Sequence, residues 1–232
     1  MTTIGLPRGL YYYRNGVLWK NFFENLGCKV IISEETNKNI LDCGVRQCSN
    51  ETCLPVKVFH GHVHNLRDKV DFVFIPRFTS LKKNEYTCPK FCGLPDMTRL
   101  NLKKTVKVLE IHVNESKSPD ILHLSLKNIS KTMKIKYARV LEAYNWAAEQ
   151  LRKTNTNKVT EHHTTANNNG IKLAVLGHPY MIYDNYLSMN LIGKIREKGI
   201  EVYTPESIHE ELKRKNAYPY RGKVFWDVGF ES

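Results

Sequence analysis

Near the start of the chain, short apolar runs alternate with a turn and with a stretch that has apolar residues at helical spacing. A short apolar run begins at Ile4 and is followed by the turn Gly5-Leu6-Pro7-Arg8-Gly9. Apolar residues then recur at helical spacing until Gly27, after which Val30-Ile31-Ile32 is a further apolar run. The helical positions are Val17, Trp19, Phe22, Phe23 and Leu26. Residues 4–36 are therefore predicted to form a strand, a turn, a helix that stops at the glycine, and a second strand.

A second stretch repeats this pattern without a gap, at an offset of 172 residues. The matches are Leu176-Gly177-His178-Pro179 with Ile4-Gly5-Leu6-Pro7, Gly199 with Gly27, and Val202 with Val30. Two units that converged on one solution would also give such a match. The equal distance between the Gly-x-Pro turn and the later glycine favours an internal duplication, and so two related halves.

The region between the two stretches predicts further elements. Pro55 to Lys69 has one apolar helical face, and Val70 to Pro76 is a buried strand ended by its proline. Thr79 to Phe91 is polar and predicts a loop. Residues 106–113 and 121–126 are weaker strand candidates.

The second part of the chain predicts one long helix and a connection. An apolar stripe runs from Ile129 to Leu151, and residues 153–170 are rich in Thr and Asn without an apolar period. We therefore expect a domain at 1–152, a polar linker at 153–170, and a second, partial βαβ unit at 171–232. The predicted fold class is α/β, a Rossmann-like parallel sheet with helices on both faces, in two related halves of which the second is short.

Length and composition agree with a globular protein. The chain has 232 residues, of which 41% are hydrophobic, enough for a packed core. No apolar run approaches the roughly 20 residues that cross a membrane, and the start at Met1 to Gly5 lacks a charged region followed by an apolar one, so no leader peptide is expected. We expect a cytoplasmic protein with no membrane partner.

The positive charge is compatible with an anionic ligand or partner, or with a solvated basic surface, which scattered lysines favour. The net charge is +12, which suits the phosphates of a nucleotide-like cofactor, an acidic protein or nucleic acid. The run Tyr11-Tyr12-Tyr13-Arg14 is the one hint of nucleic acid. Because a tyrosine also follows the Gly-x-Pro turn of the second half, packing explains it better, and nucleic acid is not expected.

Five of the six cysteines fall between positions 43 and 92. In a reducing compartment this clustering indicates metal binding, redox chemistry or plain burial rather than disulfides. Cys53 and Cys88 are each followed within two residues by a proline and then by a lysine. A proline there suits the first turn of a helix, whose free N–H groups favour an anion such as a thiolate. Both are therefore candidate ligands or nucleophiles.

The spacing of the cysteines argues against a zinc-ribbon site and leaves an iron–sulfur cluster as a candidate. The intervals are C-x4-C-x4-C over Cys43, Cys48 and Cys53, and C-x3-C at Cys88 and Cys92. They match no zinc-ribbon pattern, whereas soft thiolates also select iron–sulfur clusters. Cys43 and Cys48 suit helix or loop packing better than ligation, and Cys92 stays open between the two. The remaining cysteine, at position 28, is expected to be buried.

Other polar residues are candidates for binding a ligand. Arg8, Lys57 and Lys90 are candidates to hold the phosphates of a CoA-like ligand, although Gly-x-Pro lacks the three-glycine dinucleotide fingerprint. The histidines between 60 and 64 alternate, so they do not share one helical face as metal ligands would. His62 is the best single candidate among them, with a packing role favoured. The sequence shows no recognisable catalytic arrangement, such as a Ser/His/Asp set or a pair of carboxylates.

Several longer motifs occur in order along the chain. They are Gly5-Leu6-Pro7-Arg8 with Tyr11-Tyr12, Thr36-Asn37-Lys38, Cys53-Leu54-Pro55-Val56-Lys57 with Gly61-His62, Cys88-Pro89-Lys90 with Gly93-Leu94-Pro95-Asp96, and Gly177-His178-Pro179-Tyr180 with Tyr183-Asp184. In these motifs the chain resembles an uncharacterised family related to acyl-CoA dehydratase activases and akin to the D-component of 2-hydroxyacyl-CoA dehydratases.

The resemblance implies a cofactor. In the dehydratase relatives two Rossmann-like domains hold a 4Fe–4S cluster on cysteines, with acyl-CoA nearby, and Cys53 and Cys88 match ligand positions. Longer relatives continue past the equivalent of residues 224–226 with a further cysteine segment. A third ligand is then expected from Cys92, Cys48 or Cys43, or from another subunit.

Two functions follow as hypotheses. The first is an iron–sulfur-binding redox accessory protein of dehydratase and activase systems, working with an ATP-dependent activase or a redox partner, and compatible with a homo-oligomer. The alternative is a metal-free α/β module that binds CoA or an acidic protein partner. Whether the chain is itself an enzyme is left open.

Overall fold

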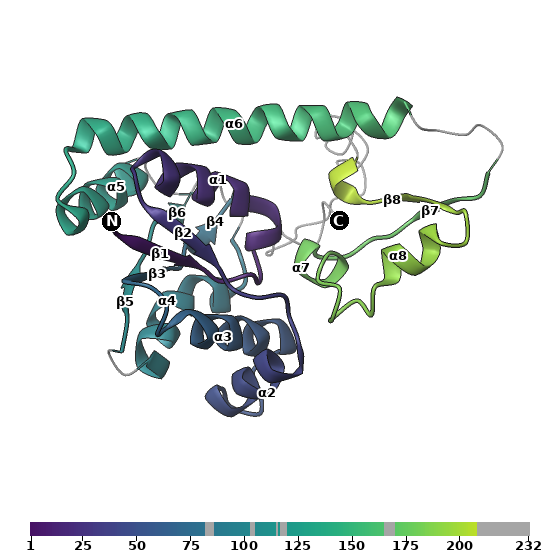
Figure 1. The fold of residues 1–232 in the computed structure, drawn as a ribbon, viewed down its shortest axis with the longest axis horizontal. Coiled ribbons are helices and arrows are strands. Elements are labelled where there is room, and N and C mark those ends of the chain that lie inside the picture. Colours follow the sequence, from purple (N-terminus) through teal and green to yellow (C-terminus); the bar gives the residue numbers. More distant parts are fainter. Residues whose placement is uncertain (82–85, 103–104, 115, 117–119, 165–169, 208–232) are drawn as a thin grey trace.

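The computed structural model describes residues 1–81, 86–102, 105–114, 116, 120–164 and 170–207 (Figure 1). In chain order its elements are β1 (Thr3–Leu6), α1 (Tyr12–Asn25), β2 (Lys29–Ile32), α2 (Lys38–Gln47), α3 (Leu54–Leu66), β3 (Phe72–Phe74), β4 (Arg77–Ser80), α4 (Pro89–Leu102), β5 (Lys107–Leu109), β6 (His112–Asn114), α5 (Asp120–Met133), α6 (Tyr137–Thr164), β7 (Lys172–Ala174), α7 (Pro179–Ile182), α8 (Leu191–Arg196), β8 (Glu201–Tyr203) and the 3-10 turn η1 (Pro205–Ser207).

A four-stranded parallel sheet in the order β2-β1-β3-β5 forms the centre of the first unit. Ile4 and Val73, on neighbouring strands, are both 0% exposed, as expected of short apolar strands covered on both faces. α1 and α6 lie on one face of the sheet, and α3 and α4 lie on the other (Figure 1). The predicted Rossmann-like α/β class is confirmed.

The first helix ends as the sequence predicts. Phe22 and Phe23 of α1 are fully buried against the core. After them Gly27 adopts φ +79°. The N–H of Gly27 donates to the carbonyl of Glu24, and the N–H of Cys28 donates to the carbonyl of Phe23. This pair of hydrogen bonds is a Schellman cap, which needs the left-handed conformation that glycine adopts most easily. Cys28 is 5% exposed, so its predicted burial is confirmed.

Three sequence-based assignments between 77 and 151 were wrong. The first two residues of the predicted loop, Thr79 and Ser80, belong to β4, which pairs in parallel with β6. Residues 121–126 belong to helix α5 rather than to a strand, because Leu126 and Ile129 bury a helical stripe. The single helix expected up to Leu151 is two helices, and Lys134 between them has φ +56°.

The predicted linker is helical in its first part. α6 continues through Thr164, so residues 153–164 are not a loop. Residues 165–169 of the linker and 208–232 of the predicted second unit lie outside the described residues. The division into two domains and a linker stays a prediction.

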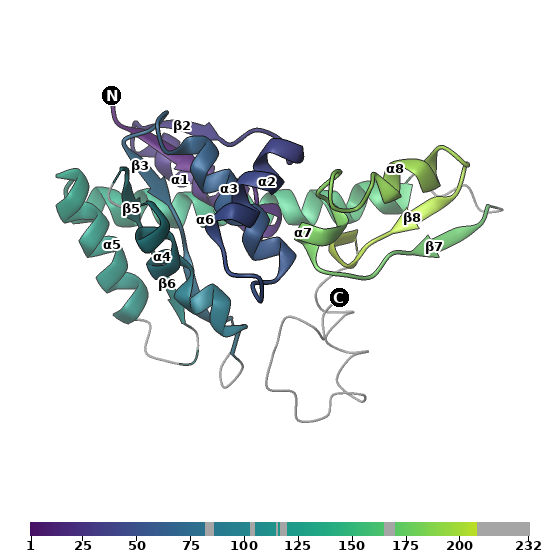
Figure 2. The same cartoon turned by 90° about the horizontal axis from the view of Figure 1, so that it is seen from below.

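The described part of the second unit is a small parallel pair, β7 and β8, with two short helices. α7 lies on the side that faces the first unit, where it contacts α1 (Figure 2). α6 extends along both units and contacts η1 (Figure 1). No helix in the described ranges combines the length and apolarity needed to cross a bilayer.

Candidate functional site

Cys53 lies at the start of helix α3, as predicted. Its carbonyl accepts hydrogen bonds from the N–H groups of Val56 and Lys57, both at 3.1 Å, and Pro55 occupies the first turn. Its backbone is extended, which is typical of a residue that caps a helix. The residue is exposed. The start of helix α3 therefore presents a solvent-accessible thiol.

Cys88 has the same kind of position one helix later. α4 begins at Pro89, and the carbonyl of Cys88 accepts the N–H of Phe91 at 2.9 Å. This thiol is also exposed. Two cysteines 35 positions apart (53 against 88) thus each lie directly before a helix, as the Cys-proline-lysine pattern predicts.

Tyr180 of the second unit lies within electrostatic range of both thiols. Its ring stacks on His178 at 5.0 Å and meets the edge of Phe91 at 6.3 Å, centroid to centroid. Burial, and to a smaller extent negative charge at Cys53 and Cys88, raises the pKa of Tyr180 to about 12. The hydroxyl is therefore protonated at neutral pH and within electrostatic reach of both sulfurs. We call Cys53, Cys88 and Tyr180 the thiol site.

Two of the three predicted phosphate-binding cations are close to this site. Burial raises the pKa of Cys48, while the charges of Lys57 and Lys90 lower it and that of Cys53 raises it. These four side chains therefore interact electrostatically. Arg8 is elsewhere, in an ion pair with a glutamate that follows β2 at 3.0 Å. The predicted cation set is thus divided between two places.

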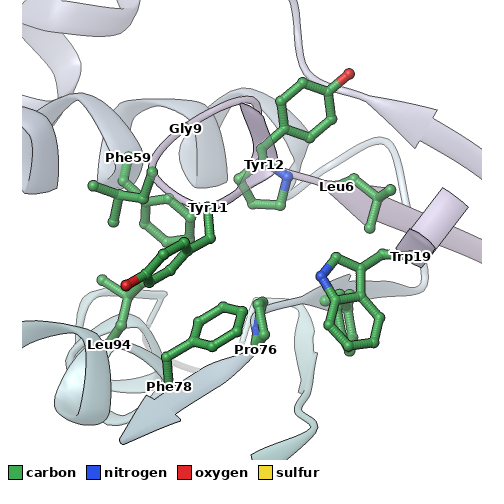
Figure 3. Close-up of a pocket in the computed structure, with 12 residues that line it drawn as sticks. Leu6, Gly9, Tyr11, Tyr12, Trp19, Phe59, Pro76, Phe78 and Leu94 are labelled. Atoms are coloured by element: carbon green, nitrogen blue, oxygen red, sulfur yellow. The ribbon is translucent and has the colours of Figure 1, made fainter. Parts of the chain in front are cut away.

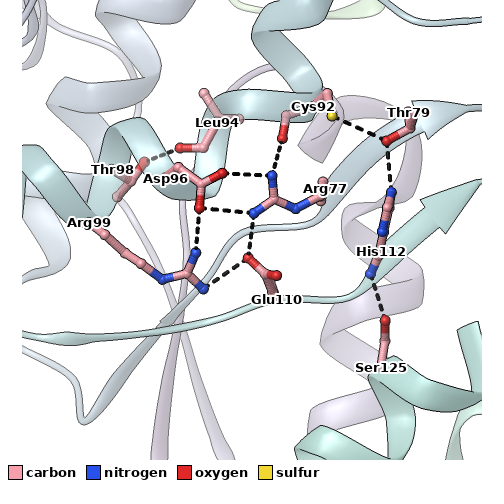
Figure 4. A network of polar contacts seen from close by, with 10 residues as sticks. All are labelled: Arg77, Thr79, Cys92, Leu94, Asp96, Thr98, Arg99, Glu110, His112 and Ser125. Atoms are coloured by element: carbon pink, nitrogen blue, oxygen red, sulfur yellow. Dashed lines mark hydrogen bonds and ion pairs between the residues drawn. The ribbon is translucent and has the colours of Figure 1, made fainter. Parts of the chain in front are cut away.

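Cys92 is held in a different polar network (Figure 4). Its sulfur accepts a hydrogen bond from the Thr79 hydroxyl at 3.3 Å, and its carbonyl accepts one from Arg77 at 2.6 Å. The Arg77 guanidinium also binds both carboxylate oxygens of Asp96 and one of Glu110. This bidentate arrangement fastens α4 to β4 and to the chain after β5. Its role is structural, and the sequence pattern did not reveal it.

The four predicted metal ligands are therefore not gathered into one centre. Cys53 and Cys88 share the thiol site, Cys48 is near Cys53, and Cys92 is bound to Thr79. Among the residues that the structure describes, no three His, Cys, Asp or Glu side chains are grouped so that they could hold a metal ion.

A buried chain of hydrogen bonds lies between the two units. Its links are Arg8 N to Ser33 Oγ at 2.8 Å, Ser33 Oγ to His62 Nδ1 at 3.0 Å, His62 Nε2 to Thr36 Oγ1 at 3.0 Å, Thr36 Oγ1 to Asp184 Oδ2, and Tyr13 OH to Asp184 Oδ2 at 3.1 Å. Burial lowers the pKa of His62 to about 4; Asp184 opposes this shift and Arg8 adds to it. His62 is thus neutral and packed inside the protein.

Sequence reasoning singled out His62 but missed Asp184, which the hydrogen-bond chain reaches through Thr36. The only local signal was that Tyr183-Asp184 and Gly61-His62 both occur among the motifs of the family resemblance. Thr36 and Asp184 are 148 positions apart. Nothing in the local pattern at either position indicates that they meet.

An apolar cavity lies where β1 and β3 end (Figure 3). It is lined by Leu6, Pro7, Gly9, Leu10, Tyr11, Tyr12, Trp19, Phe59, Phe74, Pro76, Phe78 and Leu94. Its volume is about 30 Å³, close to the share of one water molecule in the liquid. The cavity is therefore a gap in the core and has no room for an acyl-CoA.

Comparison with known proteins supplies one match. The family model described as "CoA enzyme activase uncharacterised domain" matches residues 3–208, which is well over half of the chain. No curated protein and no solved structure matches the chain.

Proposed function

Because the chain belongs to the family of the CoA enzyme activase uncharacterised domain, we propose that it is a redox accessory protein of CoA-ester chemistry. In this proposal Cys53 and Cys88 supply two thiolate ligands to an iron–sulfur cluster. The observation that carries it is the thiol site, in which two exposed thiols at the starts of two helices lie within electrostatic range of the same tyrosine hydroxyl.

The described residues do not make a complete ligand set for such a cluster. Iron–sulfur clusters held by cysteine usually take three or four thiolates, and the thiol site has two. The proposal therefore takes the remaining ligands from a second copy of the chain or from a partner protein. A bound cluster would supply one-electron transfer, and this chain's residues would bind it and shape its surroundings.

The proposed partner is an ATP-dependent activase or another electron donor. The thiol site lies at the boundary of the two units, and both cysteines are exposed. A docked protein could therefore approach the sulfurs directly. The positive charges of Lys57 and Lys90 beside the site suit an acidic partner surface.

The test is anaerobic reconstitution followed by iron and sulfide analysis and mass measurement by light scattering. A cluster shared by two copies would give about two iron atoms per chain, four iron atoms being bound by four thiolates, together with an iron-dependent dimer. Cys53→Ser and Cys88→Ser should each abolish iron binding, whereas Cys28→Ser should not. Iron retained by both ligand variants, or absent from the reconstituted wild type with and without a candidate partner, overturns the proposal.

A second candidate function is binding of CoA without a metal. It is favoured by the gathering of Lys57 and Lys90 beside the thiol site. Calorimetric titration of metal-free protein with CoA should then show binding that weakens with salt and in Lys57→Ala and Lys90→Ala. Lys20→Ala, which removes a cation of the surface pair with Glu24, is the control. Equal affinity in all three variants would rule this function out.

A further inference from the structure

Asp184 is a buried carboxylate that connects the two units. It is 2% exposed. Its Oδ1 accepts the N–H groups of Tyr186 and Leu187 of its own unit, both at 3.0 Å. Its Oδ2 accepts the hydroxyl protons of Thr36 and Tyr13 of the first unit. Four donors, two from each unit, therefore satisfy one charge that would be costly to bury alone.

The donor and acceptor of each hydrogen bond in the series from Arg8 to Asp184 can be assigned from its two ends. Thr36 has one hydroxyl proton and donates it to Asp184, so toward His62 its oxygen can only accept. His62 must then carry its proton on Nε2 and accept at Nδ1 from the Ser33 hydroxyl. The Ser33 oxygen in turn accepts the backbone N–H of Arg8. All bonds point the same way, toward the carboxylate, an arrangement in which each bond strengthens the next.

The segment that carries Asp184 also carries Tyr180. Tyr180 lies in helix α7, and Asp184 follows the last residue of this helix by two positions. The N–H groups of Ile182 and Tyr183 bond back to the carbonyls of His178 and Pro179 at 3.1 Å and 2.9 Å. Fixing Asp184 on the first unit therefore also limits the movement of the Tyr180 ring against Phe91. The two contacts lie at opposite ends of one short rigid segment.

We propose that Asp184 and Thr36 are positioning residues, which dock the second unit on the first and so hold Tyr180 at the thiol site. The role of the thiol site rests on the proposed function, whereas the docking of the two units does not depend on that function. Four motifs of the family resemblance, those with Arg8, Thr36, His62 and Asp184, meet in this one network. They would then serve docking rather than ligand binding.

The experiment measures ring-to-ring nuclear Overhauser effects in protein with labelled aromatic residues. The Tyr180–Phe91 signal reports docking, and the Trp19–Phe74 signal, across 4.9 Å inside the first unit, reports its fold. Thr36→Val and Asp184→Asn should weaken the first signal at least severalfold and leave the second unchanged. Thr36→Ser, which keeps the hydroxyl, should restore the wild-type value.

Three results would overturn the docking role. One is a Tyr180–Phe91 signal that persists in both Thr36→Val and Asp184→Asn. Another is a loss of the Trp19–Phe74 signal in Thr36→Val, since Thr36 would then support the whole fold. The third is a Thr36→Ser variant that behaves like Thr36→Val. If Asp184→Asn unfolds the second unit, the Thr36 pair still decides the question.

Failure of this inference can be told apart from failure of the proposed function. The ring signals need no iron, so they test docking even if the reconstituted protein binds none. Iron analysis of Thr36→Val adds the functional consequence. If docking is lost in this variant while iron binding equals that of the wild type, Tyr180 is not needed for ligation, and the link between docking and the thiol site is wrong.

Discussion

The two βαβ-like units share a sequence pattern, yet they fold differently. The first has one continuous helix of 14 residues, α1, between its strands. The second has α7, with four residues, and α8, with six. Ile4 is 0% exposed, whereas its counterpart Leu176 is 67% exposed. Equal apolar spacing therefore did not produce equal structure.

Local backbone geometry explains the divided helix. Asp184 Oδ1 accepts the N–H groups of Tyr186 and Leu187, which offers these groups a partner other than a helical carbonyl. Met189 and Asn190 then adopt φ +52° and +53°, outside the right-handed helical region. The buried carboxylate that docks the second unit thus also interrupts its helix.

The strand pairing differs as well. Lys29 pairs with Thr3, whereas its counterpart Glu201 pairs with Lys172. The residue that matches Thr3 in sequence is Val175, so the second pair is shifted by three residues (175 against 172). β1 is held between β2 and β3, while β7 has β8 as its only described partner. A strand with one neighbour is less constrained in register.

The largest expected effect comes from matched substitutions in the two helical stretches. Phe22→Ala should lower the free energy of unfolding by about 3–5 kcal/mol, because it leaves a cavity in the core. The counterpart of Phe22 is Lys194, and Lys194→Ala should change it by no more than about 0.5 kcal/mol. Urea unfolding followed by circular dichroism measures both. Similar losses in the two variants would mean that the second unit has a core as important as the first.

Acid should weaken the connection between the units. Unfolded histidine takes up a proton near pH 6.5, whereas His62 and His60 in the fold do so near pH 4, because burial disfavours their charged forms. Between these values the unfolded state binds more protons, so stability falls as the pH falls from 6.5 to 4. For His62 the loss is on the order of 3 kcal/mol. The free energy of unfolding, measured by urea unfolding at several pH values, should therefore fall less steeply between pH 6.5 and 4 in His62→Gln than in the wild type. An equally steep fall in the variant would contradict a buried, neutral His62.

The smallest expected effect concerns the feature that the two units keep in common. Gly27 and Gly199 follow their helices with φ +79° and +73°, and a methyl group at either would meet no atom within 4 Å. Alanine should therefore cost about 1–2 kcal/mol through backbone strain alone. We expect Gly27→Ala to lower global stability and Gly199→Ala to speed hydrogen exchange in the second unit only.

Gly93→Ala in helix α4 is the matched control for these two variants. A methyl group there also meets no atom within 4 Å, but its φ is not positive. It should stabilise the protein by about 0.5–1 kcal/mol, because alanine loses less backbone entropy in a helix than glycine does. A loss of stability in this control would show that methyl groups act here through contacts rather than strain.

Much of the fold was predictable because its signals are local. The spacing around Phe22 and the stop at Gly27 define α1, and the proline after Cys53 and after Cys88 marks the start of α3 and α4. The errors fell where local signals conflict. Residues 121–126 suit a strand in isolation, yet burial of Leu126 and Ile129 on one stripe makes them helical.

The sequence by itself therefore determined the α/β class, the family, and the helix-start positions of Cys53 and Cys88. The class and the helix starts depend on local patterns, and the family on motifs that occur in order along the chain. Only the tertiary structure decided which residues meet. It separated Cys92 from the other thiols by the Arg77 network, brought Tyr180 to them, and joined Thr36 to Asp184 across 148 positions. Contacts of this kind depend on how whole elements pack, and the chain between the partners carries no periodic signal of them.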